Sequence, residues 1–313
     1  MKSFRTHQRL LLFLLLVLTL TCIISPWMAL GADWFAARWP TVLTERVSFA
    51  RIFNRAFMIT AIILFIAARR QLVPAQLKNL LAVRFSAAAG NLLAGCALAL
   101  GSMALLITAM SVADVYTPYF RLSLAESLSR VASALFAGVF VAFLEEFFFR
   151  GMLFLSLRDQ GRPLFAYVLV NLFYSLLHFV KPGKSYFLDQ FDPAAGFRHL
   201  LTTFEPFLDT ASLLPGIFGL FLIGVLLSYA LARTGNLYLS IGLHAGWIIG
   251  LKTLRVFGDF TRGELGWAFG STDPKIVSGV ITWTGILLVG FAVHWFTRQS
   301  SQSSADRPRA ATA

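Results

Sequence analysis

The run LLPGIFGLFLIGVLLSYAL, residues 213–231, decides the class of fold. It contains 19 residues and no charged side chain, and about 20 apolar residues suffice for one helical crossing of a bilayer. Backbone amides in lipid must be hydrogen-bonded within their own segment or in a closed barrel. Because the run lacks the strict alternation of a barrel strand, it predicts a transmembrane helix.

The whole chain repeats this pattern. Of its 313 residues, 57% are hydrophobic and only 13% are charged, whereas soluble proteins carry about 25% charged residues. Apolar segments lie near residues 10–30, 52–68, 86–110, 128–157, 164–180, 213–231, 237–252 and 276–296. The first imitates a signal peptide but lacks a clean cleavage site, so we interpret it as a retained span. The sequence therefore predicts an all-α polytopic bundle of about eight spans.

The basic residues favour a membrane role over nucleic-acid binding. The formal net charge is +12, and the Lys and Arg residues cluster between the apolar segments, where they orient a chain and meet anionic headgroups. Their distribution favours an N-in, C-in orientation, and we expect an integral protein of a bacterial inner membrane. The two cysteines, Cys22 and Cys96, lie in apolar segments, which excludes a disulfide framework and a cysteine-rich metal site.

Ionisable residues inside the spans mark a candidate site, because each costs about 2.5–3.5 kcal/mol on insertion and is a functional hypothesis by default. The segment 128–157 contains Glu145, Glu146 and Arg150. Glu146 and Arg150 are four residues apart, so they share a helix face in the order that favours an ion pair. Glu145 is rotated by about 100° from Glu146, which leaves it available as a general base or acid.

Two histidines add to this set. His178 ends the segment that contains Tyr174, and His244 lies in the segment 237–252. Alone, either would be explained by a hydrogen bond to a backbone carbonyl, but two of them at the depth of Glu145 favour a shared site. Gly242 and Gly246 flank His244 and either allow close helix packing or leave room for a substrate.

The motifs Glu-Glu-x-x-x-Arg (145–150), aromatic-x-x-x-His (174–178) and a later His244 resemble those of the CAAX protease and bacteriocin-processing (Abi) family. This family consists of intramembrane endopeptidases and includes the type II CAAX prenyl endopeptidases. The resemblance covers about residues 128–251. It implies catalytic roles for Glu145, Glu146, His178 and His244, with Arg150 and Tyr174 in support. The chain departs from the family at Ile248, where Asn or Asp is common, and at Tyr174, where Phe is usual.

The resemblance also divides the chain. Residues 1–120 are expected to be helices outside the family core, 121–298 the protease core and 299–313 a disordered tail. Within the core, the loop 181–212 mixes aromatic and charged residues, as an interfacial lid or a partly buried connector would.

The implied activity is hydrolysis of a peptide bond in a membrane-anchored substrate, either CAAX-like and prenylated or a leader peptide. Glu145 would activate the water, and His178 and His244 would bind the oxyanion or position the water. No cofactor is favoured, although Glu145, His178 and His244 could instead hold a metal such as zinc. A polytopic transporter or a non-enzymatic scaffold is the remaining alternative, since a transporter also needs ionisable residues at mid-depth.

Overall fold

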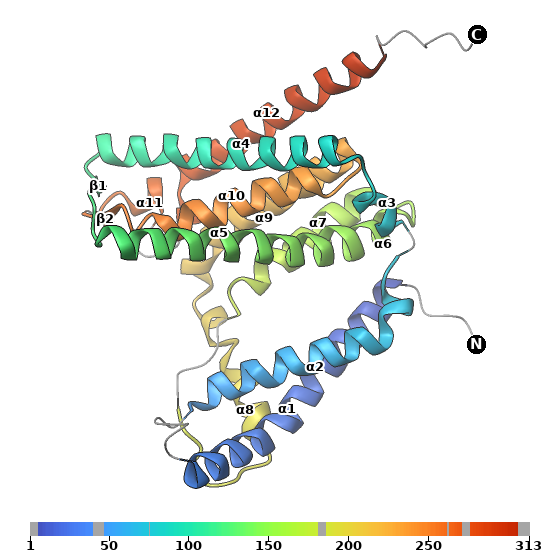
Figure 1. Cartoon of the computed structure of the whole chain (residues 1–313), viewed down its shortest axis with the longest axis vertical. Helices are drawn as coiled ribbons and strands as arrows, with labels where there is room; N and C mark the ends of the chain where they lie inside the picture. The colour runs from blue at the N-terminus through green and yellow to red at the C-terminus, as the bar shows by residue number, and fades with distance from the viewer. Residues whose placement is uncertain are drawn as a thin grey trace. The chain divides into compact units, whose positions relative to one another are not determined.

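A computed structural model describes residues 6–39, 47–74, 76–180, 186–261, 263–270 and 276–305 of the chain. These residues are almost entirely helical (Figure 1). The chain forms two compact units, and two of the three boundaries between them fall within helices. Unit 1 comprises Met1–Pro74 and Leu176–Leu213, and unit 2 comprises Ala75–Ser175 and Leu214–Ala313.

Unit 1 is a pair of long helices covered by a short one. Its elements are α1 (Thr6–Arg38), α2 (Phe49–Leu72), α8 (Ala195–Thr202) and the 3-10 helix η2 (Glu205–Leu208). Helix α1 contacts both α2 and α8, and Gly196 of α8 lies so close to the backbone of Cys22 that a Cβ atom would not fit there. The described part of the loop 181–212 thus includes a packed connector, while its role as a lid stays a prediction.

Unit 2 contains the remaining elements. They are α3 (Leu77–Leu81), α4 (Phe85–Val112), β1 (Tyr116–Pro118), α5 (Leu124–Glu146), the π-helix η1 (Phe147–Phe154), α6 (Leu155–Arg158), α7 (Pro163–Leu177), α9 (Thr210–Thr234), α10 (Tyr238–Thr253), β2 (Gly258–Phe260), α11 (Gly266–Phe269), η3 (Ile276–Ser278) and α12 (Val280–Ala305). The strands β1 and β2 pair antiparallel, with Tyr116 opposite Phe260.

Helix α10 is the centre of unit 2 and lies between α4 and α5 (Figure 1). Its contact with α4 is made by glycine: a Cβ atom on Gly242 would collide with the carbonyl oxygen of Leu92, and one on Gly95 with that of Leu239. This is the close approach that small residues permit between membrane helices. Of the two uses foreseen for the glycines around His244, the structure shows helix packing.

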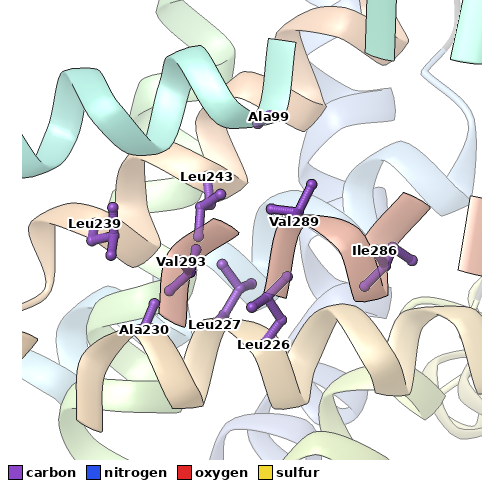
Figure 2. Close-up of a cluster of buried hydrophobic side chains, with 9 residues drawn as sticks. All are labelled: Ala99, Leu226, Leu227, Ala230, Leu239, Leu243, Ile286, Val289 and Val293. Carbon is purple, nitrogen blue, oxygen red and sulfur yellow. The ribbon is translucent and has the colours of Figure 1, made fainter. Parts of the chain in front are cut away.

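An apolar cluster joins α10 to the other helices of unit 2. Figure 2 shows its side chains converging from four helices: Ala99 of α4; Leu226, Leu227 and Ala230 of α9; Leu239 and Leu243 of α10; Ile286, Val289 and Val293 of α12. The cluster holds α9 and α12 against the helix that carries His244.

The prediction of an all-α polytopic bundle is confirmed. Among the described residues, six helices are long and apolar enough to cross a membrane, and they match six of the eight predicted spans. The other two spans correspond to α7 and α10, which have only 15 and 16 residues. Helix α12 reaches Ala305, further than expected for a tail that starts at 299, and residues 306–313 lie outside the described residues. The proposed division at residue 120 stays a prediction.

Candidate active site

The ionisable residues of α5 and η1 form a buried ion pair in unit 2. Nη1 of Arg150 lies 3.0 Å from Oε1 of Glu146, and both side chains are completely buried. The predicted pairing of residues four apart is thus confirmed. The helix widens into a π-helix immediately after Glu146, a local distortion that is frequent at functional sites.

Arg150 makes two further contacts that fix its guanidinium group. Nη2 donates a hydrogen bond to the carbonyl oxygen of Gly224 on α9, at 3.2 Å. The guanidinium carbon lies 4.4 Å from the ring centre of Tyr174 on α7, in a cation–π contact. Arg150 therefore ties α7 and α9 to the helix that carries the two glutamates.

His244 of α10 lies between the two glutamates. Its Nδ1 is 2.9 Å from Oε1 of Glu146, and its Nε2 is 3.8 Å from Oε2 of Glu145. The Tyr174 hydroxyl is 3.4 Å from the same Nε2. Unit 2 thus brings together five of the six predicted residues: Glu145, Glu146, Arg150, Tyr174 and His244.

The two glutamates differ in their access to water. The side chain of Glu146 is 0% exposed and that of Glu145 is 29% exposed. Glu146 shares its Oε1 with Arg150 and His244. Of the two carboxylates, Glu145 is therefore the one that the protein does not fully enclose.

The sixth residue, His178, belongs to unit 1. Helix α7 ends at Leu177, so His178 lies in the turn that follows, and its side chain is exposed. The expectation of apolar surroundings for His178 stays a prediction. Helix α7 thus ends before the apolar run, which continues to residue 180. Pro182 and Gly183 follow this run, and both residues disfavour a continuing helix. Convergence of His178 with the other five residues stays a prediction.

Sequence analysis missed a set of polar contacts behind Arg150. Asn171 of α7 is completely buried and accepts a hydrogen bond from Ser228 of α9 at 3.1 Å. One turn further along α7, Ser175 donates to the carbonyl oxygen of Ile217 at 2.6 Å. These bonds fix α7 on α9 beside Gly224. The signal in the sequence that could have revealed these contacts is Asn171, a polar residue in the apolar segment 164–180, three residues before Tyr174.

A metal centre would need more ligands than unit 2 provides at these distances. Catalytic zinc sites use about three protein ligands, and Glu145 and His244 present two atoms to each other. No group of three His, Cys, Asp or Glu side chains in the described residues is arranged to hold a metal ion. The third predicted ligand is His178 of unit 1, so the zinc hypothesis stays a prediction.

One family model matches this part of the chain: "Type II CAAX prenyl endopeptidase Rce1-like", over residues 127–249. Over these residues the chain is similar to that family. The match indicates a peptidase, in agreement with the resemblance seen in the motifs, and favours this activity over a transporter or scaffold. No curated protein and no solved structure matches the chain. The matched segment spans all six predicted site residues, whereas α4, which packs against its last helix, lies outside it.

Proposed function

We propose that the protein is an intramembrane endopeptidase in which Glu145 activates the water that hydrolyses a peptide bond. The observation that carries the proposal is the placement of His244 between two glutamates, with Nδ1 at Glu146 and Nε2 towards Glu145. A buried imidazole held in this way can stabilise charge that develops beside Glu145. The Rce1-like match supports an endopeptidase in general; the roles below are ours.

Glu146 is the positioning carboxylate. Arg150 forms an ion pair with this carboxylate at 3.0 Å. An ionised carboxylate accepts only, so the imidazole must donate its Nδ1–H to it. Glu146 thereby fixes the orientation and the tautomer of His244, as a second carboxylate does in many histidine-containing sites.

The protonation of His244 determines whether its Nε2 accepts or donates a hydrogen bond. In the neutral imidazole Nε2 carries a lone pair and accepts a hydrogen bond from the hydroxyl of Tyr174, 3.4 Å away. In the imidazolium Nε2 is a donor and can bind an oxyanion, with the hydroxyl of Tyr174 as a second donor. Ile248, at the position where Asn or Asp is common, has no polar side-chain atom. The hydroxyl of Tyr174 instead provides a polar group beside His244.

Glu145 takes a proton from water, and the resulting hydroxide forms a bond to the carbonyl carbon of the peptide. The electron pair of the carbonyl moves to oxygen, where the hydroxyl of Tyr174 and, in the imidazolium form, Nε2–H of His244 donate hydrogen bonds to it. The C–N bond breaks as Glu145 returns its proton to the leaving amine. His178 would serve as a further oxyanion or water-positioning group.

The substrate we propose is a membrane-anchored peptide, either CAAX-like and prenylated or a leader peptide. A site built on apolar helices favours a substrate that enters from the bilayer. The metal-dependent version, with zinc held by Glu145, His178 and His244, is the alternative. We place the protein in a bacterial inner membrane with both termini inside.

The test is cleavage of a lipid-tethered fluorogenic peptide by protein reconstituted in liposomes. Glu145→Gln should lower kcat by about 10²–10⁴-fold, the range for loss of a general base. The matched control is Glu264→Gln, which removes an exposed carboxylate elsewhere in unit 2. Unchanged turnover of the Glu145→Gln variant would refute the role of Glu145. If the variant is inactive and folded, mass spectrometry of the peptides that copurify with it will identify the substrate.

A further inference from the structure

The ends of α9 and α12 carry a second polar cluster in unit 2, separate from the candidate active site. The two helices pack together through the apolar cluster of Figure 2, where Leu226 and Ala230 of α9 meet Val289 and Val293 of α12. Both helices are long and apolar enough to span a membrane, over Ala211–Thr234 and Val280–Arg298. Side chains just beyond the apolar cluster therefore lie at the end of two adjacent spans.

The first pair in this cluster is Tyr229 and His294. The hydroxyl of Tyr229 lies 2.6 Å from Nδ1 of His294, and the side chain of His294 is exposed. Because the Tyr229 hydroxyl lies at Nδ1, the other ring nitrogen, Nε2, is the one that can donate a hydrogen bond to a ligand when it carries a proton.

The second pair lies one turn further along each helix. Nε of Arg233 donates a hydrogen bond to the hydroxyl of Thr297 at 3.1 Å, and Arg233 is exposed. This bond uses one of the five guanidinium N–H groups and leaves the two terminal nitrogens, whose paired N–H groups match a phosphate oxygen pair. Arg298, also exposed, follows Thr297 directly.

The surroundings of the cluster select an anionic ligand. No carboxylate among the described residues forms an ion pair with Arg233, His294 or Arg298. Trp295, next to His294, is 59% exposed, and exposed tryptophan is enriched where a span meets the headgroup region. At that depth the abundant anions are lipid phosphates.

We propose that Tyr229, Arg233 and His294 form a binding site for the phosphate group of an anionic phospholipid, between the ends of α9 and α12. His294 Nε2 and the terminal nitrogens of Arg233 donate to the phosphate, and Tyr229 and Thr297 hold these donors in place. Basic pockets between transmembrane helices bind headgroups in this way. An arginine in the last turn of a helix also interacts favourably with the helix dipole. That interaction would explain Arg233 alone, but it would not explain the contact between Tyr229 and His294.

The experiment measures binding of dioleoyl phosphatidylglycerol to the detergent-purified full chain by native mass spectrometry. Dioleoyl phosphatidylcholine and inorganic phosphate are titrated in parallel. Arg233→Gln should weaken phosphatidylglycerol binding about fivefold, because one basic residue near the headgroups contributes about 1 kcal/mol. Tyr229→Phe should weaken it by releasing His294, and Arg233→Lys should retain most of the affinity. The matched control is Arg130→Gln, which removes an exposed arginine of α5.

Each outcome decides the proposal. Equal affinity of the Arg233→Gln and Arg130→Gln variants would overturn the site. Binding of inorganic phosphate as strong as that of phosphatidylglycerol would overturn the assignment to a lipid. If Arg233→Gln does not fold, the comparison of Tyr229→Phe with wild type provides the same test, and no difference between them counts against the proposal.

Discussion

Replacing Arg150 with methionine tests whether the buried ion pair organises the site. Methionine retains an unbranched apolar side chain but removes the cation 3.0 Å from Glu146, the hydrogen bond to Gly224 and the contact with the ring of Tyr174. Glu146 then remains buried, with His244 as its partner. We expect the loss of stability to come mainly from this uncompensated carboxylate.

The expected loss of stability in Arg150→Met follows from the distance between Arg150 and Glu146. Two unit charges 3.0 Å apart attract by about 5–6 kcal/mol at an effective dielectric constant of about 20, and desolvation of both groups offsets part of this. Removing one partner of a buried pair costs about 3–5 kcal/mol in measured cases. Arg150→Met should therefore lower the free energy of unfolding by about 3–5 kcal/mol. The double variant Glu146→Leu with Arg150→Met has no buried charge from this pair and should come within about 2 kcal/mol of wild type.

The assay is reversible unfolding in mixed micelles, followed by circular dichroism as the fraction of sodium dodecyl sulfate increases. The two single variants and the double variant complete a mutant cycle. A cost below about 1 kcal/mol for Arg150→Met would refute the assignment of a stabilising buried pair. Additive costs in the double variant would show that the two side chains do not interact.

Three further predictions use other parts of the molecule. Gly242→Ala should separate α10 from α4 and lower both stability and peptidase activity. The control Gly101→Ala, with no atom within 4 Å of its added Cβ, should change neither, as measured by thermal unfolding and by a cleavage assay. Burial lowers the pKa of His199 below its usual 6.5, so the folded chain should lose stability as the pH falls through and below 6.5, because the unfolded chain binds the proton more readily; a His199→Phe variant whose unfolding keeps the same pH dependence would contradict this. If Glu145 activates water without a metal, 1,10-phenanthroline should leave the activity unchanged; a stoichiometric metal that is lost in His178→Ala would instead support the zinc alternative.

The sequence predicted the helices well because the hydrophobic length of a span is a property of the chain alone. The pairing of Glu146 with Arg150 was also predictable, since both residues lie on one helix. The contacts of His244 were not, because they depend on how α10 is rotated against α5 and α7. That rotation is set by close packing at Gly242, whose partner on α4 is about 150 residues away in the chain.

Two local features of the site also escaped prediction. The end of α7 before His178 was hidden by apolar residues that continue to Val180. The hydroxyl of Tyr174 was read as part of an aromatic position, although its contact with His244 makes it a polar group of the site. Hydropathy therefore indicates which segments are apolar, but it indicates neither where a helix ends nor which polar atoms come into contact.

The brevity of α7 has a consequence for the lipid around the site. Fifteen helical residues rise about 22 Å, whereas the hydrocarbon layer is about 30 Å thick, and Leu164, Phe165 and Val168 of this helix are exposed. A short segment is accommodated by thinning of the bilayer, by snorkelling of flanking residues or by oligomerisation, and we expect local thinning at this helix. Such a dimple would bring water and headgroups closer to Tyr174, and the rate of peptide cleavage should increase in vesicles made of shorter-chain lipids.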